Sequence, residues 1–178
     1  MLTLTRLTSN RTCTIGRLTS DDGRLEVLTM ESRMPIRDGS YVGWLLPPGD
    51  YEAHIEPSAV LFDDVQIRGW WLMITPVPWF PGAGLYNVSK AHTGKGRILI
   101  GSESADEFHV TDPDNTAMKQ ILRYFKQVYD EQGTAPFTLH ITHDSLVRNQ
   151  YNEEQKAEMD RDELERCKRE SIMKEIYG

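Results

Sequence analysis

Residues 2–18, LTLTRLTSNRTCTIGRL, contain two alternating runs separated by a polar turn. In the first run, Leu2, Leu4 and Arg6 share one phase, and threonines fill most of the other. The second run, residues 12–18, follows the turn-like Ser9-Asn10-Arg11. Because successive side chains of a strand point to opposite faces, this pattern predicts an early pair of β-strands.

Further short strands follow at similar spacing. Asp21-Asp22-Gly23 is a turn signal before residues 24–31, and Pro47-Pro48-Gly49-Asp50 is another before residues 51–56. Residues 65–75 form the most apolar segment, and residues 137–142 alternate as a last strand. Strands of this length and spacing predict a compact β-barrel or sandwich.

One segment has the helical period instead. Asp112 stands before Pro113 as an expected N-cap, and a glycine, Gly133, follows the last apolar position. The apolar positions between them are three or four residues apart: Met118, Ile121, Leu122, Phe125, Val128 and Tyr129. The sequence therefore predicts a mostly β (α+β) fold with one packed amphipathic helix.

The composition changes after residue 144. Residues 145–178 contain seven Lys or Arg and nine Asp or Glu, with several acid-to-base pairs four residues apart. This pattern predicts a β-rich core domain at residues 1–144 and a long, charged, solvent-exposed C-terminal helix at residues 145–178. Leu164, Ile172 and Ile176 are among its sparse apolar positions, and its end at residues 172–177 resembles a docking site. The alternative is a frayed, solvated helix that docks to nothing.

Charge and cysteine content exclude several classes of function. The formal net charge is -7, which opposes general binding to nucleic acid, because that affinity comes from clustered Lys and Arg. The two cysteines, Cys13 and Cys167, are expected to be free thiols. No signal peptide or membrane-spanning run is recognisable, so we expect a soluble protein with no membrane partner.

A long irregular stretch follows the apolar segment. Prolines at 76, 78 and 81 and glycines at 82 and 84 interrupt residues 76–95, so we expect one long loop there. Loops of this length inside compact domains tend to be functional. Trp79, Phe80 and Tyr86 make it a candidate recognition loop. The alternative is that these rings pack back onto the core.

Residues 93–101, TGKGRILIG, raise the question of a phosphate-binding loop. Such a loop needs Gly-x-x-x-x-Gly-Lys-Ser/Thr, but Ser89 stands at the first glycine position and Gly96 follows Lys95. The segment also leads from a loop into a strand, whereas phosphate loops lead from a strand into a helix. We expect a glycine turn into a core strand, with Lys95 and Arg97 available for contacts.

Catalytic and metal motifs are equally weak. His140 and His143 are three apart on an expected strand and so point to opposite faces, which excludes a shared metal ion. No Gly-x-Ser-x-Gly motif occurs. We assign no catalytic residue, no metal and no cofactor, although Ser89, His92 and Asp106 could form a site that spacing does not reveal.

Four segments, taken in order, resemble a family of small domains of unknown function found largely in bacteriophages, prophages and bacteria. They are TIGRL (14–18), LTME (28–31), LPPGDY (46–51) and GRILIG (96–101). Members of that family typically carry a strand ending in Ile-His and a Gly-Cys-Ile-Leu-Val-Gly loop. This pair resembles the catalytic layout of L,D-transpeptidases, in which a histidine activates a cysteine thiolate. Here Thr75 stands at the histidine position and Arg97 at the cysteine position, so both reactive groups are absent.

The resemblance, together with the missing nucleophile, favours a non-catalytic phage-type structural or protein-interaction protein. It would be located in the host cytoplasm or in the virion, and its partner would be another protein or a second copy of itself. The expected contact residues are Trp79, Phe80, Tyr86, Lys95, Arg97, Leu164, Ile172 and Ile176. Two alternatives stay open: an enzyme that acts on peptidoglycan or another small ligand, and a phage inhibitor of a host factor.

Overall fold

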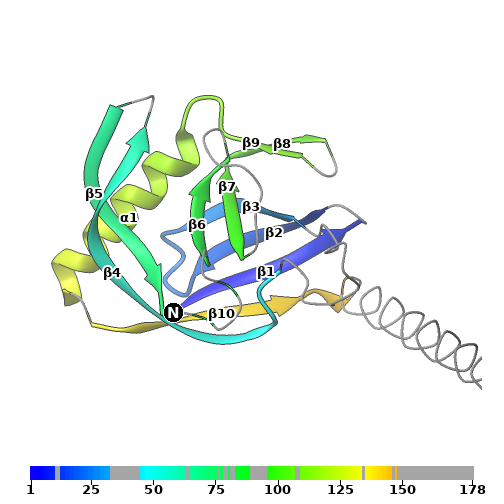
Figure 1. The fold of residues 1–178 in the computed structure, drawn as a ribbon, viewed down its shortest axis with the longest axis horizontal. Coiled ribbons are helices and arrows are strands. Elements are labelled where there is room, and N and C mark those ends of the chain that lie inside the picture. Colours follow the sequence, from blue (N-terminus) through cyan, green and yellow to red (C-terminus); the bar gives the residue numbers. More distant parts are fainter. Residues whose placement is uncertain are drawn as a thin grey trace, which may run out of the picture. The chain divides into compact units, whose positions relative to one another are not determined.

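The computed structural model describes residues 1–10, 13–32, 45–62, 65–75, 77, 80, 83–88, 96–106, 109–133, 135–145 and 147, with residues 58–62 and 65–70 described by backbone alone (Figure 1). The chain divides into two compact units, Met1–Asp144 and Ser145–Gly178. Nearly all of the described residues belong to the first unit. Apart from residues 145 and 147, the expected C-terminal helix lies outside the described residues.

The first unit is mostly β and is built on one eight-stranded sheet, in the order β5-β4-β10-β1-β2-β3-β7-β6. The strands are β1 (Leu2–Ser9), β2 (Cys13–Ser20), β3 (Glu26–Ser32), β4 (Gly49–Phe62), β5 (Val65–Ile74), β6 (Gly84–Asn87), β7 (Arg97–Gly101) and β10 (Phe137–His143). β1 is parallel to β10 and β6 is parallel to β7, and the other neighbours are antiparallel. A separate hairpin consists of β8 (Glu103–Asp106) and β9 (His109–Thr111).

The sheet curls until its two edge strands approach each other, which makes a nearly closed barrel (Figure 1). Across the remaining gap, Nε1 of Trp71 on β5 donates a hydrogen bond of 3.3 Å to the carbonyl oxygen of Leu85 on β6. The expectation of a barrel-like β fold with one packed helix is therefore confirmed. The early strand pair is also confirmed, because β1 and β2 are antiparallel neighbours.

Helix α1 (Thr116–Gln132) closes the core. Its buried face consists of Ala117, Met118, Ile121, Tyr124, Phe125 and Val128. The Phe125 ring meets the Trp71 ring edge-on, with centroids 5.8 Å apart. On the sheet side, alternate residues of β1 and β10 such as Leu2, Leu4 and Leu139 are fully buried in the same cluster. No helix among the described residues is both long and apolar enough to cross a membrane.

The start of α1 differs from the sequence prediction. The helix begins at Thr116, and its N-cap is Asn115 with a φ of 53°, so Asp112 and Pro113 precede the helix instead of opening it. The Asp112 carboxylate nevertheless accepts hydrogen bonds from the backbone N–H groups of Ala117 and Met118, at 3.0 and 3.2 Å. Asp112 lies three residues before the N-cap. Its side chain nevertheless bonds two backbone N–H groups of the first turn that have no partner within the helix.

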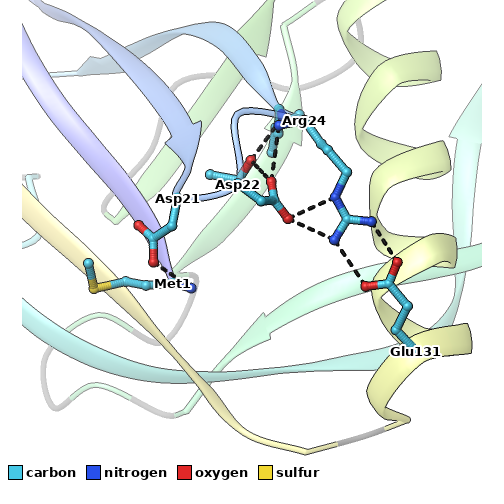
Figure 2. Close-up of polar contacts among 7 residues, drawn as sticks. Met1, Asp21, Asp22, Arg24 and Glu131 are labelled. Carbon is cyan, nitrogen blue, oxygen red and sulfur yellow. Dashed lines mark hydrogen bonds and ion pairs between the residues drawn. The ribbon is translucent and has the colours of Figure 1, made fainter.

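The far end of α1 is joined to the β2–β3 turn by charged side chains (Figure 2). The Arg24 guanidinium donates to both carboxylate oxygens of Glu131, at 2.7 and 3.0 Å. Its Nε donates to Asp22 at 2.8 Å, and the amino terminus of Met1 lies 3.1 Å from the neighbouring Asp21. These contacts fix the helix end to the turn at the surface of the unit.

The loop expected at residues 76–95 is only partly a loop. It contains β6, which pairs with β7 from Gly84↔Arg97 to Asn87↔Ile100. A run of four residues that begins with a glycine carries too weak an alternation to be recognised as a strand, so the prediction of one continuous loop was wrong. The β8–β9 hairpin was also not predicted.

Candidate functional site

Residues of β6 and β7 form the described part of the expected contact surface. The Arg97 guanidinium carbon lies 4.9 Å from the centroid of the Tyr86 ring, a cation–π distance. Gly84 pairs with Arg97, which places Tyr86 two residues further along the parallel strand. Both side chains are partly exposed. The structure therefore brings two of the expected contact residues together.

Phe80, in contrast, is not displayed at the surface. Its side chain is 5% exposed and belongs to the hydrophobic core. The turn at Gly96, with a φ of 73°, lies against it, and a Cβ at Gly96 would come within 3.1 Å of Phe80 Cδ1. Phe80 thus follows the alternative of packing back onto the core. Trp79, Lys95, Leu164, Ile172 and Ile176 lie outside the described residues.

The glycine at position 96 answers the question raised by TGKGRILIG. Gly96 is a turn residue, and β7 begins immediately after it at Arg97. β7 then pairs with β3 on one side and β6 on the other, and Ile98, Leu99 and Ile100 are buried. The segment from residue 96 onward is a turn into a core strand, as predicted, and residues 93–95 lie outside the described part.

The structure describes both Thr75 and Arg97, the two positions that the sequence resemblance would align with a histidine and a cysteine. At the end of β5, Thr75 Oγ1 donates to Glu52 Oε1 at 3.2 Å, and the Thr75 backbone N–H donates to the Glu52 carbonyl at 2.9 Å. At the start of β7, Arg97 lies over Tyr86. Each side chain therefore contacts a neighbour, and neither supplies a thiol or an imidazole.

Asp106 is the described member of the alternative Ser89–His92–Asp106 site. Its carboxylate contacts Nδ1 of His109, the next strand's first residue, at 2.9 Å, and both side chains are exposed. Ser89 and His92 lie outside the described residues. Within the described ranges, no three His, Cys, Asp or Glu side chains converge as metal ligands would.

The buried ion pair of Arg6 and Glu31 was not predicted from the sequence. Arg6 Nε and Nη2 donate to the two carboxylate oxygens of Glu31, both at 2.8 Å, and Nη2 also donates to the Leu46 carbonyl at 2.7 Å. Arg6 is 1% exposed and Glu31 is 2% exposed. Such a forked pair inside a core is stabilised by its geometry and by the extra acceptor, which offset part of the desolvation cost.

The position of Gly16 explains how the pair crosses β2. Arg6 is opposite Gly16 on β2, and Gly16 is opposite Thr29 on β3, two residues before Glu31. A Cβ at Gly16 would come within 2.7 Å of Thr29 Oγ1 and 2.8 Å of the Thr5 carbonyl oxygen. The absence of a side chain at Gly16 thus leaves room for β1 and β3 residues to meet above β2.

Other polar groups surround this pair. The Ser9 and Thr14 hydroxyls are 2.8 Å apart, and Thr29 Oγ1 is buried without a hydrogen-bond partner among the described residues. Burial raises the pKa of Tyr51, the nearby Glu31 charge raises it further, and the Arg6 charge opposes both. Because Arg6 and Glu31 are sealed from solvent and neutralise each other, we interpret them as a structural pair.

Comparisons with models of protein families, with curated proteins and with solved structures find no match. The candidate site therefore rests on geometry alone. It consists of the partly exposed Tyr86–Arg97 pair on β6 and β7.

Proposed function

We propose that this protein is a non-catalytic structural or protein-interaction protein of the type that bacteriophages encode. The observation that carries the proposal is the Tyr86–Arg97 pair, a partly exposed aromatic–guanidinium stack. Tyr and Arg are enriched among residues that dominate binding energy, because each offers a large rigid surface together with hydrogen-bond donors. Trp79, Lys95 and the tail residues Leu164, Ile172 and Ile176 are the further contact residues that the sequence predicts.

The chemistry of the two substituted positions supports a binding role. A cysteine–histidine pair acts through a thiolate, and neither a threonine hydroxyl nor a guanidinium can replace it. Thr75 bonds to Glu52 instead, and Arg97 stacks on Tyr86. The protein would work in the host cytoplasm or in the virion, with a protein as its partner.

The proposal is tested by affinity capture with the full chain from cells that express it. Tyr86→Ala and Arg97→Ala are compared with Arg17→Ala, a matched control on β2 whose side chain is 47% exposed and pairs with Glu26. We expect wild type and Arg17→Ala to retain the same bound protein. We expect that protein to bind about tenfold more weakly to Tyr86→Ala.

A parallel assay measures turnover of peptidoglycan fragments by the same proteins. We expect no turnover. Hydrolysis or transpeptidation that His92→Ala or Asp106→Asn abolishes, in a protein that still unfolds like wild type, would replace the binding proposal with the enzymatic alternative.

A further inference from the structure

The interior of the barrel has an apolar end and a polar end. Along the inward phase of β1, Leu2 and Leu4 belong to the hydrophobic cluster, whereas Arg6 binds Glu31. The buried polar side chains at this end come from three neighbouring strands: Arg6 and Ser9 on β1, Thr14 on β2, and Thr29 and Glu31 on β3. Because a buried polar group without a hydrogen bond is destabilising, each of them requires a partner.

Thr29 is the residue of this polar end whose hydroxyl has no hydrogen-bond partner within the described part of the chain. Arg6 and Glu31 are joined by two hydrogen bonds, and the Ser9 and Thr14 hydroxyls are 2.8 Å apart. Thr29 is 0% exposed, so bulk solvent does not reach its hydroxyl either. Buried hydroxyls both donate and accept, and those that lack a protein partner are commonly bonded to an internal water.

The backbone around Gly16 shows where such a water fits. On β2, Gly16 lies opposite Arg6 on one side and opposite Thr29 on the other. The point that a Cβ of Gly16 would occupy is 2.7 Å from Thr29 Oγ1 and 2.8 Å from the Thr5 carbonyl oxygen. The side chain of Leu4, a core residue, lies 3.3 Å from the same point, which places it on the inward side of β2. A small molecule above Gly16, slightly farther from the Cα than a Cβ, is within reach of both oxygens.

We infer that a water molecule is bound inside the barrel above Gly16, where it links β1 to β3. The Thr29 hydroxyl donates to this water, and the water donates to the Thr5 carbonyl oxygen. Its second hydrogen is directed at Glu31, which follows Thr29 by two residues and therefore faces the same side of β3. Each Glu31 oxygen accepts one bond from Arg6 and has a further lone pair. The water thus makes about three hydrogen bonds, as buried waters usually do.

Charge and hydrogen-bonding capacity select water over an ion. Arg6 and Glu31 neutralise each other, so this ion pair leaves no net charge for an ion to compensate. A cation above Gly16 would lie beside the Arg6 guanidinium, and an anion would face the Thr5 carbonyl oxygen and the Glu31 carboxylate, so each would be repelled. A neutral molecule that both donates and accepts matches the hydroxyl and the two acceptor oxygens.

A crystal structure of the full chain, at a resolution that shows ordered water, tests the site directly. We expect a water about 2.7–3.2 Å from both Thr29 Oγ1 and the Thr5 carbonyl oxygen. Thr29→Ser keeps the hydroxyl and should retain this water, whereas Thr29→Val should lose it. No water beside Thr29 in the wild-type crystal, or a direct bond from its hydroxyl to a protein atom, would overturn the inference.

Stability distinguishes a bonded hydroxyl from an unpaired one. Valine has nearly the shape of threonine, so Thr29→Val removes the hydroxyl and leaves the packing almost unchanged. Removing a bonded hydroxyl is destabilising, whereas removing an unpaired one is neutral or stabilising. We therefore expect the equilibrium constant for unfolding, measured in urea, to rise about fivefold in Thr29→Val. A Thr29→Val chain that is as stable as wild type or more stable would show that the hydroxyl has no partner.

Thr14→Val is the matched control for this measurement. Thr14 is equally buried on the neighbouring strand, and its hydroxyl has a protein partner in Ser9. We expect Thr14→Val to raise the unfolding constant to a similar extent, which shows that the assay detects the loss of one buried hydroxyl bond. None of these variants changes Tyr86 or Arg97, so failure of the water site leaves the proposed binding role to its own test.

Discussion

Arg6 and Glu31 contribute to the stability of the fold as a pair. Both are buried, and their two hydrogen bonds at 2.8 Å are intact only while both are present. We expect Glu31→Ala to lower the free energy of unfolding by about 3–5 kcal/mol, because it leaves an unpaired buried guanidinium. Chemical denaturation measures this loss.

The control is the double replacement Arg6→Met with Glu31→Leu. Removing both charges together leaves no uncompensated ion, so we expect this variant to be about as stable as wild type or more stable. A single Glu31→Ala variant that is as stable as wild type would show that solvent reaches Arg6.

The absent side chain at Gly16 is a second requirement of the same region. An alanine Cβ there would meet Thr29 Oγ1 and the Thr5 carbonyl at less than 3.0 Å, so strands must shift. We expect Gly16→Ala to cost about 1–3 kcal/mol in denaturation experiments. Gly23→Ala is the comparison, since nothing lies within 4 Å of its Cβ and only its φ of 71° opposes the change. Equal costs for the two variants would refute a steric role for Gly16.

The sequence could predict the burial of Arg6 but not its partner. Arg6 shares the phase of Leu2 and Leu4, and the structure buries all three. Its partner Glu31 lies two strands away, beyond β2, and no local pattern encodes such a contact. The Tyr86–Arg97 pair was likewise visible only as two separate candidates, because parallel pairing of β6 and β7 brings them together.

At the scale of single elements, the first turn of α1 depends on Asp112. Its carboxylate accepts from two backbone N–H groups that have no partner within the helix. We expect Asp112→Ala to reduce stability by about 1–2 kcal/mol, as for other lost caps, and Asp114→Ala to have little effect because its side chain is exposed. Thermal unfolding followed by circular dichroism distinguishes them, and equal midpoints would contradict the capping role.

The ion pairs at the far end of α1 should make the stability of the fold depend on pH. Hydrogen bonds from the Arg24 side chain hold the pKa of Asp22 and of Glu131 below their ordinary values, and Ser20 and the Arg24 backbone N–H contribute at Asp22. A carboxylate whose folded pKa is depressed stabilises the fold above its unfolded pKa, about 4, and loses this contribution as the pH falls through the folded value. We therefore expect wild type to lose more stability than Arg24→Ala as the pH falls from about 5 to 2.

Lys126→Ala is the matched control. It removes an exposed ion pair on the same helix, in which Lys126 Nζ lies 2.6 Å from Asp130 Oδ2, and it leaves the turn unchanged. Its acid sensitivity should follow that of wild type. Parallel acid profiles for wild type and Arg24→Ala, measured by denaturation at each pH, would show that Arg24 does not link the turn to the helix.

Elements with a strong local pattern were predictable, and those without one were not. The alternation of β1 and β10 and the helical period of α1 reflect burial on one face, which the sequence records directly. β6, β8 and β9 are three or four residues long, and strands this short carry too few alternations to be distinguished from a loop. The helix start was misplaced because Asp112 caps from outside the helix.

At the scale of the whole molecule, the barrel depends on its last strand, β10. β10 lies between β1 and β4, pairing in parallel with one and antiparallel with the other, so the last strand of the first unit joins its first strand. Sequence patterns do not encode this order, because parallel pairing of β1 with β10 joins residues more than 130 positions apart. The sheet is therefore complete only in a chain that extends to residue 143.

This topology predicts opposite results for two truncations. A chain ending at Asp144 retains every strand of the sheet and the whole first unit, so we expect cooperative unfolding in urea, followed by tryptophan fluorescence. A chain ending at Gly133 loses Leu139 and Ile141 from the core and leaves β1 and β4 without their common neighbour, so we expect no cooperative transition. If the chain ending at Asp144 also unfolds without cooperativity, residues 145–178 are part of the folding unit; if the chain ending at Gly133 folds, the central place of β10 is refuted.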